Sequence, residues 1–258
     1  MAKMNVFVDG SWLFKVCQPD GVLSQKTERD TYPFPIDFAK LNKEIVSHIC
    51  KEESSCTDIG DCYFATSIFD LPSDFEDWPN RYSDVSQSNI EITKKNVAAR
   101  EAFTNKAISA GFKDSAVYRP KFKKYMLDNL LKKRFQEKMV DASVVALLVK
   151  YAITNPSDFH VVITGDSDIL PAIKVAYPEY SKNVIIATAH PDELRAEHRQ
   201  TSFSYTEFSF QYSAFYFQEH IKEIIEGNHV YTCNKCSRIL VRANEIPKSS
   251  MPYCSNCR

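Results

Sequence analysis

Two acidic motifs follow apolar runs that read as buried strands. Residues 164–168 read Thr-Gly-Asp-Ser-Asp, and residues 9–11 read Asp-Gly-Ser. Carboxylates brought together repel one another and raise one another's pKa, so a cluster of them persists when a cation neutralises it. Oxygen ligands without nitrogen or sulfur favour Mg²⁺ or Mn²⁺. Asp9, Asp166 and Asp168 are therefore candidate ligands of a hard divalent cation.

Asp141 is a further candidate, at the start of the apolar stretch 142–149. An acid in the first turn of a helix is also favoured by the helix dipole, so a purely structural role is open for it. Ser167 and Asp168 have a similar alternative, since either could cap the short helix expected after them. Two strand ends that each offer an aspartate favour the metal site over capping alone.

Four cysteines near the end of the sequence form two tight pairs. Two residues separate Cys233 from Cys236 and Cys254 from Cys257, and seventeen residues lie between the pairs. Four thiolates at this spacing predict tetrahedral Zn²⁺ in a closed, structural site. So short a segment has little core of its own, so metal binding is expected to be its main folding force.

The formal net charge of −1 hides two basic segments. Residues 119–138 hold eight Lys and Arg residues against two acids, and residues 230–258 hold five against one. Positive surfaces on an acidic body are typical of a protein that binds a polyanion. The alternative is two solvated faces of opposite sign. The expected nucleic-acid contacts are Arg119, Lys121, Lys123, Lys124, Lys132, Lys133, Arg134, Lys235, Arg238 and Arg242.

The elements that must position these residues alternate between short apolar runs and longer amphipathic ones. This alternation predicts an α/β fold, with a parallel sheet covered by helices. In such a sheet the ligand site lies beyond the carboxyl ends of the strands. Strands are expected at 4–8, 62–69, 117–122, 159–164 and 183–188, helices at 36–50, 90–110, 139–153 and 168–176, and a surface loop at 71–89.

Length and composition predict one full-sized domain with a small appendage. The expected parts are a main domain at 1–202, an aromatic-rich connecting segment at 203–229 that packs on it, and a zinc ribbon at 230–258. No apolar run is long enough for a membrane span, and the first residues do not read as a signal peptide. A cytoplasmic protein that does not contact membranes is expected.

Three segments together resemble the NYN domain family, a branch of the PIN-like nuclease superfamily. They read Val-Asp-Gly-Ser at 8–11, Glu-Lys-Met-Val-Asp at 137–141 and Thr-Gly-Asp-Ser-Asp-x-x-Pro at 164–171, and the resemblance covers roughly residues 3–200. One departure is Met139, where many relatives have glycine. The resemblance implies a PIN-like parallel sheet flanked by helices, with an acidic pocket that binds divalent metal and cleaves RNA. Carried over residue by residue, it assigns Asp9, Asp141, Asp166 and Asp168 to the pocket, Ser11, Thr164 and Ser167 to supporting hydroxyls, and Lys138 to a phosphate contact.

The resulting hypothesis is a metal-dependent endonuclease that hydrolyses phosphodiester bonds in RNA. Mg²⁺ or Mn²⁺ would act at the acidic pocket, and the zinc ribbon would assist nucleic-acid binding. A catalytically inactive adaptor is one alternative, with the ribbon binding nucleic acid or a protein partner. A DNA nuclease is another, because both nucleic acids present the same phosphates and the preference for RNA comes from the resemblance.

Overall fold

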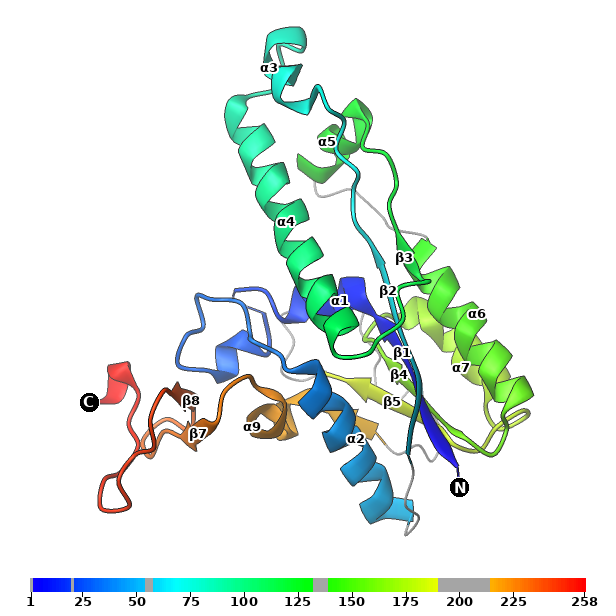
Figure 1. The fold of residues 1–258 in the computed structure, drawn as a ribbon, viewed down its shortest axis with the longest axis vertical. Coiled ribbons are helices and arrows are strands. Elements are labelled where there is room, and N and C mark those ends of the chain that lie inside the picture. The colour runs from blue at the N-terminus through cyan, green and yellow to red at the C-terminus, as the bar shows by residue number, and fades with distance from the viewer. Residues whose placement is uncertain (1, 20, 54–57, 132–138, 190–213) are drawn as a thin grey trace.

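A parallel sheet of six strands forms the centre of the protein in the computed structural model, which describes residues 2–19, 21–53, 58–131, 139–189 and 214–258 (Figure 1). Apolar and β-branched runs form the central strands because their side chains pack on both faces of a covered sheet. The order is β3-β2-β1-β4-β5-β6, and every neighbouring pair is parallel. The strands are β1 (Lys3–Asp9), β2 (Asp58–Ser67), β3 (Val117–Tyr118), β4 (Phe159–Ile163), β5 (Val184–Thr188) and β6 (Ala214–Tyr216).

The direction of winding reverses between β1 and β4. From β1 the chain adds β2 and β3 on one side, and it then returns to place β4, β5 and β6 on the other. The connections that leave β1 and β4 therefore diverge, and parallel sheets bind ligands in the crevice that such a reversal leaves at the carboxyl ends of the strands. The topology thus marks the ends of β1 and β4 as the first place to examine for a site.

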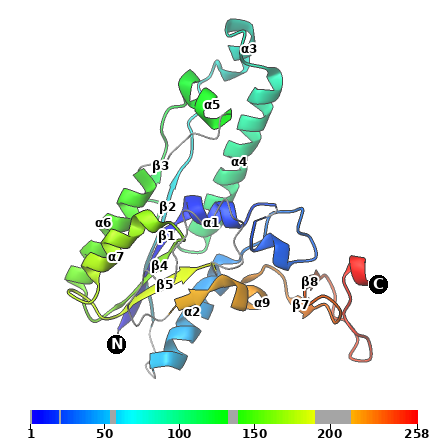
Figure 2. The same cartoon turned by 180° about the vertical axis from the view of Figure 1, so that it is seen from behind.

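Helices cover both faces of the sheet and bury two apolar cores. Met4, Val6 and Val8 of β1 belong to the core under α2 and α9, whereas Phe7 points to the opposite core under α6 and α7. Figure 2 shows α6 and α7 side by side, away from α2 and α9. The helices are α1 (Gly10–Val16), α2 (Phe38–Glu53), α3 (Trp78–Arg81), α4 (Gln87–Ser109), α5 (Lys124–Leu131), α6 (Met139–Thr154), α7 (Leu170–Ala176) and α9 (Ile221–Ile224), with short 3₁₀ helices η1 (Ser24–Lys26), η2 (Phe75–Asp77), η3 (Ser167–Ile169), η6 (Phe217–Glu219) and η7 (Ser255–Cys257).

An arm built from α3, α4 and α5 projects from one side of the sheet (Figure 1). Its tip has a small core of its own, around Phe75, Trp78 and Phe122. α4 begins sharply because Ser86 accepts the N–H of Asn89 while the Asn89 side chain accepts the N–H of Ser86, which satisfies two N–H groups at the helix start.

A two-stranded antiparallel hairpin of β7 (His229–Thr232) and β8 (Ile239–Arg242) lies near the C-terminus, apart from the main sheet (Figure 1). The first cysteine pair lies in the turn of this hairpin, and the second lies in the last residues of the chain. We call residues 229–258 the ribbon.

The α/β fold with a parallel sheet is confirmed, and the differences from the expected elements are local. The aromatic-rich segment contributes β6, with Phe215 and Phe217 fully buried in the core; its residues 203–213 lie outside the described part. The expected loop at 71–89 holds η2, α3 and the start of α4, and β3 is shorter than expected. Within the described ranges, no helix combines the length and apolar character needed to cross a bilayer.

Candidate acidic site and four-cysteine cluster

Asp9 and Asp166 lie at the ends of the two neighbouring strands where the winding reverses. Val8 is paired with Ile163 in the β1–β4 register, so Asp9, the last residue of β1, lies beside Thr164. Thr164 donates its hydroxyl to Oδ2 of Asp9 at 3.0 Å, and its Oγ1 accepts the N–H of Asp166 at 3.1 Å. One buried hydroxyl therefore joins the two strand ends and positions both acidic residues.

The buried surroundings of Asp9 disfavour ionisation of its carboxyl group. Its side chain is only 2% exposed, and Oδ1 accepts the N–H of Trp12 at 2.9 Å, which caps α1. Burial raises the pKa of Asp9 to about 6 and the carboxylate of Asp166 adds to this effect, although the hydrogen bonds from Trp12 and Thr164 act in the opposite direction. A nearby cation would favour the charged form of this carboxyl group.

The turn after β4 presents the second motif. Oδ1 of Asp166 accepts the N–H of Asp168 at 3.0 Å, so Asp166 itself caps η3, the role considered above for Ser167 or Asp168. Ser167 is partly exposed and Asp168 is exposed. An added Cβ at Gly165 would lie 2.4 Å from Nε1 of Trp12, so this close approach requires glycine.

Asp141 lies in the first turn of α6 and is partly exposed. Two residues further on, Ser143 shares a hydrogen bond of 2.6 Å with Tyr118 at the end of β3. At the other end of α6, Tyr151 is bonded to Asp61 in the first half of β2. The helix therefore runs antiparallel to the strands, and Asp141 lies at the carboxyl edge of the sheet, as Asp9 does.

The carboxylates at this edge do not form a tight cluster. Among the residues that the structure describes, the only group of three or more possible metal ligands whose ligand atoms all lie within 4.8 Å of one another is the set of four cysteines. The described contacts thus join Asp9 and Asp166 through Thr164 and leave Asp141 and Asp168 as flanking acids.

Arg100 is a residue at this edge that sequence reasoning missed. Its Nη1 donates to Oγ of buried Ser11 at 3.3 Å and to the carbonyl of Ser67 at 3.2 Å, and its guanidinium carbon lies 5.2 Å from the centre of the Phe14 ring. Ser67 ends β2, so α4 delivers a cation to the carboxyl ends of β1 and β2. No motif marks this arginine, because Ser11 lies 89 residues away in the sequence.

The basic segment after β3 is only partly available for nucleic acid. Arg119 makes two hydrogen bonds of 2.8 and 2.7 Å to the carboxylate of Glu101, and Lys124 is paired with Asp84. Lys121 and Lys123 are exposed. Lys132, Lys133, Arg134 and Lys138 lie outside the described residues.

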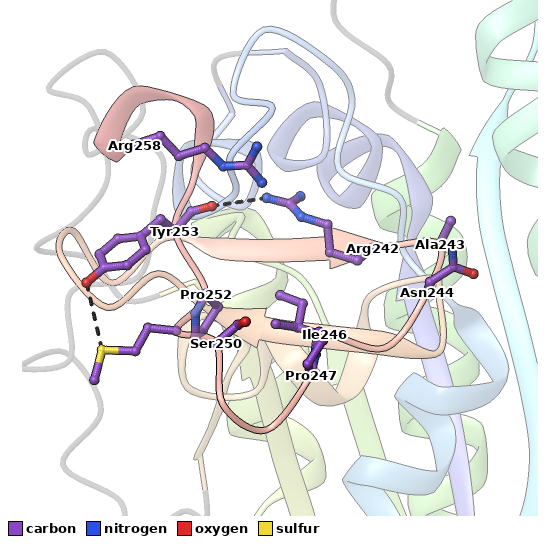
Figure 3. A pocket seen from close by; sticks show the side chains of 10 residues that line it. Arg242, Ala243, Asn244, Ile246, Pro247, Ser250, Pro252, Tyr253 and Arg258 are labelled. Carbon is purple, nitrogen blue, oxygen red and sulfur yellow. Dashed lines mark hydrogen bonds between the residues drawn. The ribbon is translucent and has the colours of Figure 1, made fainter.

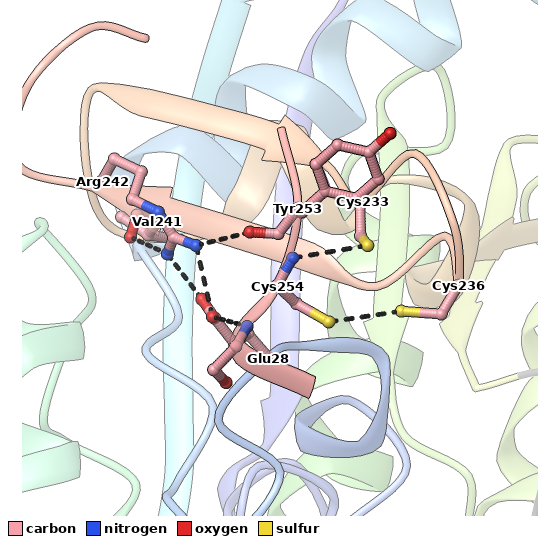
Figure 4. Close-up of polar contacts among 8 residues, drawn as sticks. Glu28, Cys233, Cys236, Val241, Arg242, Tyr253 and Cys254 are labelled. Carbon is pink, nitrogen blue, oxygen red and sulfur yellow. Dashed lines mark hydrogen bonds and ion pairs between the residues drawn. The ribbon is translucent and has the colours of Figure 1, made fainter. Parts of the chain in front are cut away.

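The four cysteines of the ribbon lie close together, and the cluster could hold a metal ion. Sγ of Cys236 and Cys254 are 3.6 Å apart, and the N–H of Cys254 points to Sγ of Cys233 at 3.4 Å (Figure 4). Burial raises the pKa of the Cys233 thiol, but backbone N–H groups of Cys254, Lys235 and Cys236 outweigh this effect and lower the pKa overall. Such N–H groups stabilise a thiolate, the form in which cysteine binds metal.

The ribbon is docked on the loop that follows α1. Arg242 donates to both carboxylate oxygens of Glu28, at 2.5 and 3.2 Å, and the N–H of Ser255 donates to the same carboxylate (Figure 4). Arg238 is paired with Asp30 at 3.0 Å. Two of the three arginine and lysine residues expected to contact nucleic acid from the ribbon thus bind acids of this same chain, whereas Lys235 is exposed.

Two cavities adjoin this docked ribbon, and no sequence motif indicated either. One, of about 440 Å³, lies within the ribbon and is lined by the side chains drawn in Figure 3, among them Ile246, Pro247, Tyr253 and Arg258. The other, of about 670 Å³, lies between the ribbon and the loop after α1.

Comparison with known proteins does not assign the chain to a family. No protein-family profile matches it, and no curated protein matches it. Among solved structures, the chain is similar to the crystal structure of a protein of unknown function from Vibrio parahaemolyticus, with a TM-score of 0.43 and 11% identity over 87% of this chain and 96% of that one.

Proposed function

We propose that the protein is a metal-dependent endonuclease of the NYN, PIN-like type that hydrolyses phosphodiester bonds in RNA. The observation that carries the proposal is the pair Asp9 and Asp166, joined through Thr164 where the winding of the sheet reverses. The choice of RNA comes from the resemblance of the three acidic segments to the NYN family.

The donor set fits Mg²⁺ or Mn²⁺. Mg²⁺ keeps several waters and is usually held by one or two carboxylates together with substrate phosphates, so a tight cluster of three acids is not required. Asp9 and Asp166 supply the two carboxylates, and a cation beside them would offset the raised pKa of Asp9. The four thiols of the ribbon are soft donors and fit Zn²⁺ in a structural role.

In the mechanism, hydrogen bonds within the chain fix the orientation of the carboxylates that would surround the scissile phosphate. A divalent cation bound at this edge would neutralise charge on the phosphate and lower the pKa of an attacking water. Thr164 and the Trp12 N–H hold the Asp9 carboxylate in one orientation, and capping of η3 fixes that of Asp166. Asp141 and Asp168, which are more exposed, would orient water or accept its proton.

A cleavage assay tests the proposal. Purified protein is incubated with labelled RNA and labelled DNA, in Mn²⁺, in Mg²⁺ and after metal removal, beside Asp166→Asn and the matched control Asp77→Asn. Asp77 is an exposed acid on the arm. We expect RNA cleavage that needs the metal and is lost in Asp166→Asn alone, with circular dichroism showing an unchanged fold.

Each other outcome selects an alternative. Undiminished cleavage by the metal-free sample or by Asp166→Asn contradicts the assignment. Cleavage of DNA alone identifies a DNA nuclease, and binding without cleavage identifies the adaptor.

A further inference from the structure

The larger cavity is a cleft between two segments that are fastened at both ends. At one end Thr27 pairs with Ile239 as an isolated parallel bridge, and at the other Ile36 pairs with Ile225. Between these bridges the loop 28–35 separates from the residues before β7 and from β8, which leaves the cleft of about 670 Å³. This volume lies within the range of sites for small ligands.

Three side chains that line the cleft carry groups that can bind a ligand, namely a guanidinium, a phenol ring and an imidazole. Arg29 is exposed, Tyr32 is 63% exposed and His229 is partly exposed. Within the described part of the chain, none of these three side chains makes a hydrogen bond or an ion pair. The exposed tyrosine ring and arginine guanidinium are therefore accessible to a ligand that enters the cleft.

The acids that line the cleft are already engaged. Glu28 is bound by Arg242 and by the N–H of Ser255, and Glu226 is paired with Lys106 at 2.7 Å. The guanidinium of Arg29 is therefore the uncompensated charge of the cleft among its described lining residues. The cleft suits a ligand that combines a negative charge with a flat, apolar part.

We propose that this cleft binds an unpaired nucleotide of the RNA, with the base against Tyr32 and a phosphate against Arg29; the inference rests on the proposed function and identifies its substrate as single-stranded at this point. Aromatic side chains stack on bases that are not already stacked in a duplex. A guanidinium matches the geometry of a phosphate. The ribbon assists binding by forming one wall of the cleft, while Arg238 and Arg242 hold that wall in place.

Binding of single-stranded RNA tests the cleft separately from catalysis. The protein carries Asp166→Asn so that it cannot cleave, contains zinc, and is titrated into a fluorescein-labelled oligoribonucleotide and into a matching duplex. Tyr32→Ala and Arg29→Gln are compared with Tyr180→Ala, which removes an exposed tyrosine outside the cleft. Tyr32→Phe keeps the ring and serves as the conservative variant.

We expect Tyr32→Ala and Arg29→Gln each to weaken binding of the single strand about tenfold, with little effect on the duplex. Tyr32→Phe and Tyr180→Ala should bind as the parent does. Arg29→Gln should also reduce the slope of log affinity against log salt concentration by about the amount that one phosphate contact contributes. Thermal unfolding of each variant checks that the exposed substitutions leave the fold intact.

Failure of the cleft and failure of the nuclease proposal are distinguishable. If the two variants bind single-stranded RNA as the parent does, or if the parent binds no single-stranded RNA, the cleft proposal is overturned, whatever the cleavage assay shows. If polyglutamate displaces the RNA and Tyr32→Ala has no effect, the cleft recognises charge alone and the proposal also fails. Selective loss of binding in a protein whose unmutated form does not cleave supports the cleft and overturns the nuclease.

Discussion

Thr164 donates its hydroxyl to the Asp9 carboxylate at 3.0 Å and thereby links two strands of the sheet at their carboxyl ends. The same oxygen accepts the N–H of Asp166, so the positions of the two acids depend on each other. Because Asp9 is almost fully buried, its protonation state responds to whatever binds beside it. This arrangement leads to two predictions about pH and stability.

Metal binding should weaken below pH 6. The pKa of Asp9 is raised to about 6, so below that pH a cation must compete with a proton for the carboxylate. We expect Mn²⁺ affinity, measured by isothermal titration calorimetry, to fall by about tenfold for each pH unit below 6 and to level off above 7. Affinity that stays constant from pH 4.5 to 7.5 would show that Asp9 is not a ligand.

Asp9→Asn should gain stability relative to the unmutated protein as pH rises. The folded-state pKa is raised from 3.8 to about 6, so this carboxyl group's contribution to stability is fully present below pH 3.8 and is lost as pH rises through 6. Asparagine does not ionise. In metal-free buffer, the difference in unfolding free energy should therefore shift in favour of Asp9→Asn by about 2 kcal/mol between pH 4 and pH 7.5.

Urea unfolding at both pH values, in the presence of EDTA, measures this shift. Asp158→Asn is a control, because Asp158 lies before β4 at the opposite end of the strand. A difference between Asp9→Asn and the parent that does not vary with pH would contradict the raised pKa.

Substitution of Gly165 should disturb Trp12. An alanine Cβ would lie 2.4 Å from the indole nitrogen, so either the ring or the turn after β4 must move. We expect Gly165→Ala to cost about 1–3 kcal/mol of stability and to change the near-UV circular dichroism of Trp12, measured in a Trp78→Phe background. An unchanged spectrum and an unchanged melting temperature would show that the Trp12 indole does not lie against Gly165.

Removal of metal from the four cysteines should release the loop after α1. The ribbon holds Glu28 and Asp30 through Arg242 and Arg238, and its own folding is expected to depend on the metal. Hydrogen exchange at residues 24–37 should therefore rise after chelation or in Cys254→Ser, while exchange in β1 stays slow. Cys50→Ser is the matched control, since Cys50 lies on α2 outside the cluster.

Ser237 should accept glycine with a gain in stability. It adopts a φ of 60°, in the left-handed region that costs residues with a Cβ about 1 kcal/mol. We expect Ser237→Gly to stabilise the metal-loaded ribbon by about 0.5–1 kcal/mol, measured as its resistance to a chelator. Ser249→Gly in the nearby loop should leave this stability unchanged. Equal or faster metal loss in Ser237→Gly would count against this.

Local patterns in the sequence predicted the central strands, the long helices and the acids at the ends of β1 and β4. The apolar runs before Asp9 and Asp166 are long enough to specify buried strands, and parallel strands bring their carboxyl ends to one edge. The cysteine spacing predicted the cluster in the same way, because the pairs lie in short turns.

Tertiary contacts decided the features that these patterns did not predict. The aromatic run that contains β6 fits a strand or a helix equally well, and its pairing with β5 depends on residues far away in the sequence. The basic residues were predicted as nucleic-acid contacts, and the local sequence did not indicate that Arg119, Arg238 and Arg242 also pair with acids from other elements. Asp166 caps η3 in place of its neighbours because the helical segment begins at Ser167, one residue earlier than the expected start at 168.

The bond between Glu28 and Arg242 joins residues 214 positions apart. At synthesis rates of about 5–20 residues per second, Glu28 is made roughly 10–40 s before its partner. The loop after α1 therefore lacks its partner in the nascent chain until the ribbon has been translated. A chain truncated before the ribbon would keep the residues of the acidic edge and lack one wall of the cleft.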